Sequence, residues 1–312
     1  SEALKEPSID AIFGSINGIE GMIDDHLIDL KTMIRTNEDM EMLLQTPSTV
    51  LGSCRYKLKD WHDDDTVYQK IIHCFEQRQI GAFFYIGGND SMDTVLKLSE
   101  YVKEKGLNTK IIGIPKTIDN DIYGTDVTFG FHTAVDIATD AIDRLHTTAN
   151  SHSRILLCEI MGNKAGWLTL NAGIAGGADI ILIPEIPYDI DKVCKSVLKR
   201  SESGKNFSII AVAEGCFDKE EAKLKKKERA RLRAEAGVIT ATNRIAAQIQ
   251  QKTQLEARVC VPGHMLRGGS PSAYDRILAT QFGVYAAQLI KEEHYGMTVA
   301  KVGGTITANP LA

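Results

Sequence analysis

The sequence predicts an α/β fold in which mostly parallel strands form a sheet with helices on both faces. Two observations carry this prediction. Apolar runs of strand length alternate with segments of helical periodicity between residues 82 and 213. The chain also has 312 residues, which corresponds to about two domains of roughly 150 residues each.

Each predicted element rests on its local pattern. Short apolar runs such as AFFYI, KIIGIP and SIIAVA predict buried strands at 82–86, 110–115, 154–159, 180–184 and 208–213. The segments between them predict helices at about 93–105, 133–149, 167–175 and 190–200. In the helix at 133–149, one face collects Ala134, Ile137, Ala138, Ala141, Ile142 and Leu145.

The segment 219–236 is dense in charge and reads KEEAKLKKKERARLRAEA. Glu–Lys and Glu–Arg neighbours four residues apart favour a solvated helix. A polyanion-binding role is the alternative, and it is disfavoured because acidic residues are interleaved with the basic ones.

Composition excludes several classes of protein. With 43% hydrophobic residues, 25% charged residues and a net charge of −5, the chain is neither disordered nor basic enough for bulk nucleic-acid binding. Its longest apolar stretches have about five residues, far fewer than the roughly 20 of a membrane span. No leader peptide is visible, and the six cysteines are scattered without a CxxC pair. We therefore expect a cytoplasmic protein with reduced thiols, and neither a disulfide framework nor a zinc site.

Ligands of open α/β sheets bind beyond the carboxyl ends of the strands, so the residues that follow each strand are candidates for the site. Gly87-Gly88-Asn89-Asp90-Ser91 follow the first predicted strand. Two glycines allow close backbone approach, and the next helix offers free N–H groups to a phosphate. A tight turn without function is the alternative here.

The strand at 110–115 is followed by Lys116-Thr117-Ile118-Asp119-Asn120-Asp121. Two carboxylates, a hydroxyl and a lysine at one strand end indicate phosphoryl transfer, with a carboxylate as general base and a cation that neutralises the phosphoryl charge. Asx-turns and a helix cap are the structural alternative.

Three later segments have the same character. MGNKAGW at 161–167 and Glu214-Gly215 follow further strands, and His264 and Arg267 lie beside glycines in the segment 261–271. Arginine binds phosphate in a bidentate manner, which suits an anionic substrate.

Together, GGNDS, PKTIDND, EIMGNKAGW, AEG and GHMLRGGSPSAYDR, in this order, resemble the phosphofructokinase family over residues 11–312. The resemblance implies Mg²⁺-dependent phosphoryl transfer to the 1-hydroxyl of fructose 6-phosphate, a step of glycolysis. It implies two Rossmann-like three-layer lobes with mostly parallel sheets and an active-site cleft between them. Residues 8–130 plus 266–312 are expected to bind the phosphoryl donor, and residues 131–265 fructose 6-phosphate.

The resemblance also implies roles for single residues. Asp119 corresponds to the general base, with Lys116, Thr117 and Arg55 as further catalytic residues. The residues that correspond to substrate contacts are Thr117, Asp119, Asp121, Arg154, Met161, Gly162, Asn163, Glu214, Arg258, His264 and Arg267. Arg154 and Arg258 correspond to arginines that reach the 6-phosphate from a neighbouring subunit, which implies a homodimer or homotetramer with shared active sites.

Gly88, Asn89, Asp90, Ser91 and Lys116 correspond to the donor site. Members of the family that use ATP usually have Gly at the position of Asp90, whereas members that use pyrophosphate have Asp there. Its charge repels the α-phosphate of a nucleotide. Together with Lys116, Asp90 favours pyrophosphate as the donor and a reversible reaction. An ATP-dependent member and a non-catalytic regulatory homologue are the alternatives.

The sequence departs from the family pattern at three places. The family opens with a strand and a GGDxPGxN loop that the sequence does not contain, so we expect the given sequence to lack an N-terminal portion. Asn89, the expected metal ligand, stands where related members have Asp, and an amide is a poorer Mg²⁺ ligand than a carboxylate. The metal is then expected to use pyrophosphate oxygens, or Asp119 and water. Asn163 replaces an arginine whose phosphate contact Lys164 could supply.

Overall fold

The computed structural model describes residues 3, 7, 9–46, 48–235, 237 and 240–311. The chain separates into two compact units. Unit 1 comprises Ser1–Thr117, Ile122–Phe129 and Ser270–Ala312, and Unit 2 comprises Ile118–Asp121 and Gly130–Gly269. Residues 8 and 312, which bound the expected donor-binding part, lie outside the described residues.

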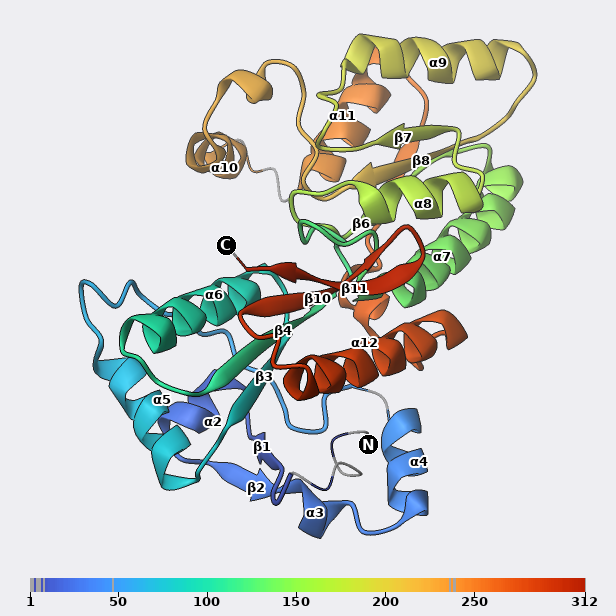
Figure 1. The fold of residues 1–312 in the computed structure, drawn as a ribbon. Coiled ribbons are helices and arrows are strands. Elements are labelled where there is room, and N and C mark those ends of the chain that lie inside the picture. The colour runs from blue at the N-terminus through green and yellow to red at the C-terminus, as the bar shows by residue number, and fades with distance from the viewer. Residues whose placement is uncertain are drawn as a thin grey trace. The chain divides into compact units, whose positions relative to one another are not determined.

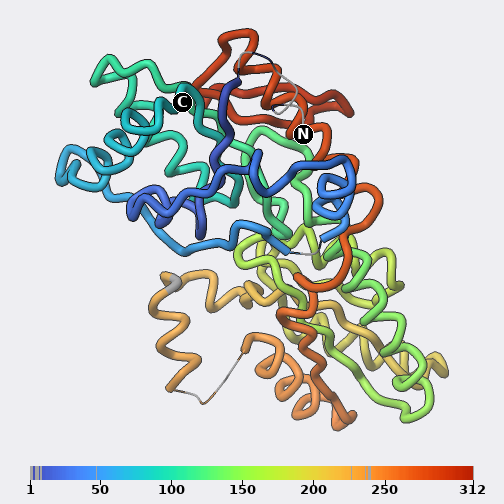
Figure 2. The backbone as a smooth tube through the Cα atoms, turned by 90° about the horizontal axis from the view of Figure 1, so that it is seen from below, coloured from blue at the N-terminus to red at the C-terminus, as the bar shows by residue number. Residues whose placement is uncertain are grey.

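Unit 1 is built on a sheet with the strand order β11-β10-β4-β3, with β5 added on β4. Its strands are β3 (Ala82–Gly87), β4 (Lys110–Thr117), β5 (Phe129–Gly130), β10 (Met297–Val302) and β11 (Thr305–Pro310). β3, β4 and β10 are parallel and β11 is antiparallel. β10 therefore lies beside β4 although the two strands are distant in sequence (Figure 2).

Helices cover this sheet. Figure 1 shows the strands passing between α6 (Asn89–Glu104) and α12 (Ala273–Lys291). The remaining elements of Unit 1 are β1 (Phe13–Ser15), α2 (Ile19–Ile23), β2 (Leu27–Asp29), α3 (Leu30–Met33), α4 (Asn37–Gln45) and α5 (Thr66–Gln77). α5 is amphipathic: Tyr68, Ile71, Ile72 and Phe75 recur at helical spacing and are buried with Val95 and Leu98 of α6 in one apolar core.

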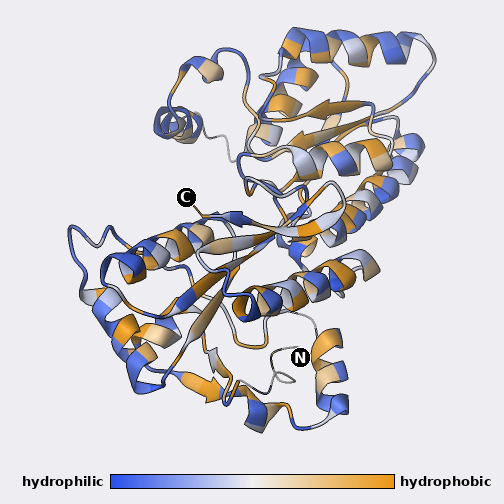
Figure 3. Ribbon diagram, in the orientation of Figure 1, coloured by the Kyte–Doolittle hydropathy of each residue, from blue (hydrophilic) through white to orange (hydrophobic). Residues whose placement is uncertain are grey.

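Unit 2 contains a fully parallel sheet with the order β7-β8-β6-β9. Its strands are β6 (Ile155–Ile160), β7 (Ile180–Leu182), β8 (Ser208–Ala213) and β9 (Ala257–Cys260). Every residue of β6 and β8 is buried, because helices cover both faces. Figure 3 shows the hydrophobic colour concentrated on these strands.

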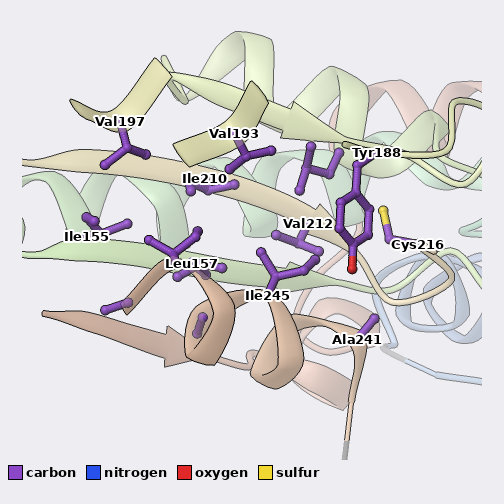
Figure 4. Close-up of a cluster of buried hydrophobic side chains, with 14 of the residues drawn as sticks. Ile155, Leu157, Tyr188, Val193, Val197, Ile210, Val212, Cys216, Ala241 and Ile245 are labelled. Atoms are coloured by element: carbon purple, nitrogen blue, oxygen red, sulfur yellow. The ribbon is translucent and has the colours of Figure 1, made fainter. Parts of the chain in front are cut away.

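The helices of Unit 2 form two packed pairs. α9 (Ile190–Glu202) packs on α11 (Ala241–Thr253), and α7 (Phe131–His152) packs on α8 (Trp167–Ala175). Figure 4 shows the core beside the first pair, in which Val193, Val197 and Ile245 meet Leu157 and Ile210 of the sheet. η1 (Glu221–Lys223), α10 (Lys226–Glu235) and η2 (Gly263–Arg267) complete the unit.

This architecture confirms the predicted α/β fold with mostly parallel sheets. All five predicted strands are present, and the observed boundaries differ from the predicted ones by a few residues. Two differences affect the site. β4 extends to Thr117, and α6 begins at Asn89, so Asn89, Asp90 and Ser91 form the first turn of a helix instead of a loop. Within the described residues, no helix combines the length and apolarity that a membrane span requires.

The prediction of a solvated helix over 219–236 is confirmed only for α10, which is mostly exposed and has an ion pair between Arg231 and Glu235 four residues apart. The described part forms η1 and α10, and residue 236 lies outside it. Glu221 is buried and forms ion pairs with Arg233 at 2.7 Å and Arg244 at 2.6 Å. These partners are 12 and 23 positions away, so neighbours four residues apart do not account for this carboxylate. Arg233 also donates to the carbonyl oxygen of Cys216, which ties α10 to the segment that follows β8.

We expect Glu221→Gln to lower the free energy of unfolding at neutral pH by about 3 kcal/mol, because Arg233 loses its carboxylate partner and Arg244 keeps only Asp218. Burial raises the pKa of Glu221, but hydrogen bonds and charge from Arg233 and Arg244 outweigh it and hold the pKa below its ordinary value of 4.5. A depressed pKa stabilises the folded state above the ordinary value, and this contribution is lost as the pH falls through the depressed value. Urea titrations at a series of pH values measure both effects.

The matched control is Glu220→Gln, whose side chain is 78% exposed and pairs with Lys223. We expect it to stay within about 0.5 kcal/mol of the parent. The variant at Glu221 also loses less stability on acidification than the parent protein does. If the free energy of unfolding falls equally with pH in Glu221→Gln and in the parent protein, the stabilising role of the ionised Glu221 is contradicted.

Candidate active site

The residues expected at the donor site lie in Unit 1, at the carboxyl ends of two neighbouring strands. Gly87 of β3 is directly opposite Pro115 of β4, so Gly88 and Lys116 are the next residues on adjacent strands. The carbonyl oxygen of Lys116 lies 3.6 Å from where a Cβ on Gly88 would be. Lys116 is exposed, and its strand neighbour Pro115 is buried. The parallel pairing therefore brings a cation to the turn that opens α6.

Gly87 allows the tight passage from β3 into α6. A Cβ at this position would lie 2.1 Å from Oγ of Ser91, so only glycine fits beneath that hydroxyl. Ser91 also hydrogen-bonds with the phenol oxygen of Tyr85, whose pKa burial raises to about 12. The Ser91 hydroxyl thus has a structural role in addition to its place at the expected donor site.

Asp90 is the second residue of α6. Its side chain is 78% exposed, and Lys57 Nζ lies 3.8 Å from its Oδ1. The first turn of a helix has unpaired backbone N–H groups and a positive dipole end, which attract anions. Asp90 therefore places a fixed negative charge where a phosphate would otherwise be favoured.

A cavity of about 1740 Å³ opens within Unit 1. Arg55, Gly87, Gly88, Ser91 and Lys116 line one part of it. Small-molecule pockets usually measure about 300–1,000 Å³, so the cavity exceeds what a compact phosphate donor needs. Three of the expected donor-site residues, Gly88, Ser91 and Lys116, and the expected catalytic Arg55 therefore share one concave surface. Asn89 and Asp90 are exposed beside it in the first turn of α6.

The carboxylates of the TIDND segment belong to Unit 2, since the boundary falls between Thr117 and Ile118. Asn120 separates Asp119 from Asp121 and has a left-handed backbone with φ 52°. Asparagine tolerates this conformation better than most residues. Thr128 donates to the carbonyl oxygen of Thr117 at 2.7 Å and fixes the end of β4 on the Unit 1 side.

In Unit 2, the segments after β6 and β8 are joined by a carboxylate. Oε1 of Glu214 accepts hydrogen bonds from the backbone N–H groups of Gly162 at 3.2 Å and Asn163 at 2.7 Å. Gly215 packs so closely that an added Cβ would lie 2.1 Å from the carbonyl oxygen of Asn163. The contact brings together Gly162, Asn163 and Glu214, and holds them beside Met161.

Asn163 departs from the family pattern, and its backbone has φ 53°. Asparagine is enriched in this left-handed conformation, whereas arginine is not. The side chain is exposed, as is that of the neighbouring Lys164.

The two expected phosphate-binding arginines of Unit 2 share one carboxylate. Glu256 pairs with Arg154 at 2.8 Å and with Arg258 at 2.5 Å. Hydrogen bonding from Arg154 is the main cause of the lowered pKa of Glu256. Both arginines keep exposed surface, at 36% for Arg154 and 58% for Arg258. Sequence analysis missed Glu256, although its position two residues before Arg258 in the strand segment placed it on the same face.

His264 and Arg267 lie on η2. In a 3₁₀-helix, side chains three residues apart eclipse each other, so these two share one side of the element. Both are exposed, whereas Leu266 between them is buried and anchors the turn.

Mg²⁺ commonly binds through one or two protein groups together with substrate phosphates. The side-chain oxygens of Asn89 and Asp90 at the first turn of α6 are exposed, and such a position would suit an ion carried mostly by a phosphorylated substrate. Within the described part of the chain, no group of three His, Cys, Asp or Glu side chains could hold a metal ion by itself.

Comparisons with known proteins identify the family and the fold. The sequence model of the family described as Phosphofructokinase matches residues 3–290. Proteins named ATP-dependent 6-phosphofructokinase from Spirochaeta thermophila and Chloroflexus aurantiacus are 44% and 40% identical, over 96% of this chain and 81% of theirs. A solved pyrophosphate-dependent phosphofructokinase from Nitrosospira multiformis matches with a TM-score of 0.84 and 26% identity, over 99% of this chain and 77% of that one. A second one, from Marinobacter aquaeolei, matches with a TM-score of 0.78 and 26% identity, over 97% and 74%.

Proposed function

The chain belongs to the phosphofructokinase family of glycolytic phosphotransferases, and on that premise we propose that its phosphoryl donor is pyrophosphate. The proposed reaction yields fructose 1,6-bisphosphate and phosphate from fructose 6-phosphate, and it is reversible. The observation that carries the proposal is Asp90, the second residue of α6. Its carboxylate, 78% exposed, puts negative charge at the helix end where a nucleotide would need room for a further phosphate. Lys116, next to Gly88 on the adjacent strand end, is the proposed partner of the leaving phosphate.

We assign the chemical step to Asp119. Its carboxylate accepts the proton of the 1-hydroxyl, the hydroxyl oxygen forms a bond to phosphorus, and the bond from phosphorus to the bridging oxygen of pyrophosphate breaks. Lys116 and Arg55 offset negative charge on the donor. Thr117 and Asp121 position the acceptor, and Mg²⁺, when bound, supplies positive charge to the phosphoryl oxygens with Asn89 as its proposed protein ligand.

Residues of Unit 2 are proposed to bind fructose 6-phosphate. Glu214 and the Met161–Asn163 segment form one hydrogen-bonded group, and His264 and Arg267 share one side of η2. Arg258 is exposed, Arg154 is half-buried, and Glu256 holds the two together, which suits arginines that reach the 6-phosphate in a neighbouring subunit. We therefore propose a cytoplasmic homodimer or homotetramer with shared active sites.

An ATP-dependent enzyme is the second candidate. The names of the relatives from Spirochaeta thermophila and Chloroflexus aurantiacus favour it, and a cavity of about 1740 Å³ offers more volume than pyrophosphate fills.

Initial rates of fructose 1,6-bisphosphate formation with Mg²⁺ and either donor test the proposal. We expect turnover with pyrophosphate and at least tenfold less with ATP at equal concentration, which corresponds to a barrier difference of about 1.4 kcal/mol or more. Preferential turnover with ATP replaces the proposal with the second candidate. Binding of fructose 6-phosphate without turnover on either donor indicates a non-catalytic homologue.

A further inference from the structure

Two cysteines of Unit 2 lie directly opposite each other on neighbouring parallel strands. Cys158 of β6 is paired in register with Cys260 of β9. Neighbouring strands are about 4.7–4.9 Å apart, which falls within the Cα separation of about 4.4–6.8 Å found in disulfides. All six cysteines are free thiols in this structure.

The two side chains also point to the same face of the sheet. Ile155 and Leu157 of β6 point into the core shown in Figure 4, so Cys158, the next residue, points to the opposite face. On β9, Ala257 and Val259 pack against that same core, so Cys260 points to the opposite face as well. The two thiols therefore face each other on that side of the sheet.

The two thiols differ in access and in acidity. Cys158 is fully buried, whereas Cys260 is half-buried and precedes Val261, which is 51% exposed. The hydrogen bond to Cys260, together with burial, raises the pKa of Cys158, and the hydrogen bond from Cys158 lowers the pKa of Cys260. Cys260 therefore has the better access to a small oxidant.

We propose that Cys158 and Cys260 are a redox pair that a hydroperoxide converts into a reversible disulfide within Unit 2. The Cys260 thiolate attacks a peroxide oxygen, the O–O bond breaks, and a sulfenic acid forms as hydroxide or alkoxide leaves. The Cys158 sulfur then attacks the Cys260 sulfur, the S–O bond breaks, and water leaves. The two thiols together supply the two electrons that reduce one peroxide, and a small dithiol restores them.

Oxidation of the pair would affect residues of the proposed fructose 6-phosphate site. β6 leads into the Met161–Asn163 segment, and β9 leads through Val261 into η2, which carries His264. A disulfide would clamp the two strands that position these residues. We expect the oxidised protein to bind fructose 6-phosphate several-fold more weakly, an effect that rests on the proposed function, whereas disulfide formation itself does not.

Mass spectrometry of the full chain tests the proposal. After exposure of the folded protein to hydrogen peroxide, we expect free thiols to fall from six to four per chain. Non-reducing peptide mapping should show Cys158 linked to Cys260, with full reversal by dithiothreitol. Cys158→Ala should leave a sulfenic acid at Cys260 that dimedone traps, without a cross-link.

The control is Cys194→Ala, which changes a buried cysteine on the opposite side of the sheet, in the core beside α9. It should still form the link between Cys158 and Cys260. Three results overturn the proposal: no linked peptide from the oxidised protein, stable oxidation of Cys260 beside a free Cys158 thiol, or a link that appears only after urea has unfolded the chain. Each of them can be read without a measurement of activity, so failure here is distinct from failure of the proposed function.

Discussion

Asp119→Ala is expected to lower kcat by roughly 10²–10⁴-fold with either donor, since a positioned general base contributes about that much. Without the carboxylate, the 1-hydroxyl must lose its proton to water while its oxygen attacks phosphorus. Asp119→Asn keeps the size of the side chain but cannot accept the proton, so it should lose a similar factor. Initial rates at saturating fructose 6-phosphate and pyrophosphate measure the loss.

Asp140→Ala is the matched control for this experiment. Asp140 is also a Unit 2 aspartate, but it lies on α7, its side chain is 60% exposed, and it pairs with the exposed Arg144. We expect this variant to keep the parent rate, because exposed ion pairs contribute only about 0–1 kcal/mol to stability. Circular dichroism confirms that each variant is folded. Unchanged turnover in Asp119→Ala would remove Asp119 from the mechanism.

Five strands were predicted correctly from their apolar runs, and two of them, β6 and β8, are buried along their whole length. β6 and β8 read as continuous apolar runs because helices cover the sheet on each side, and such runs are visible without any partner strand. β10 and β11 were missed. They are partly exposed and form a hairpin across Gly303-Gly304, whose sequence signal is a turn between two short alternating segments.

The candidate site was predictable for a related reason. Parallel strands end at the same edge of a sheet, so the order of segments along the chain indicates which loops gather there. The partners of the site residues were not predictable in this way. Glu256 lies two residues before Arg258, but it reaches Arg154 only because β9 pairs with β6. Glu221 pairs with Arg233 and Arg244 only because three separate segments meet. Such contacts depend on tertiary placement, which spacing in the sequence does not encode.

The cysteines show the same limit. In the sequence they are scattered, which favours isolated reduced thiols. The strand register makes Cys158 and Cys260 direct neighbours, and a register between strands that are distant in the chain cannot be derived from local patterns.

Asp90→Gly is expected to shift donor preference toward ATP by roughly 100-fold in the ratio of kcat/KM values, because removing like-charge repulsion at a phosphate changes affinity by several kcal/mol. The first turn of α6 then presents its backbone N–H groups to an anion without a competing carboxylate. Asp90→Asn keeps most of the volume and removes the charge. If Asp90→Asn shifts the donor preference as far as Asp90→Gly does, charge repulsion selects the donor. If only Asp90→Gly shifts the preference, the volume of the side chain selects it.

Asp191→Gly separates this effect from a general weakening of a helix start. Asp191 is the second residue of α9, as Asp90 is of α6, and it also pairs with a lysine, Lys252, at 2.8 Å. Both substitutions place glycine in a first turn, so both should cost similar helix stability, while only Asp90→Gly should change the donor ratio. The donor assignment is contradicted if the parent enzyme already prefers ATP and Asp90→Gly leaves the ratio of kcat/KM values for the two donors unchanged. This result would leave the role of Asp119 intact.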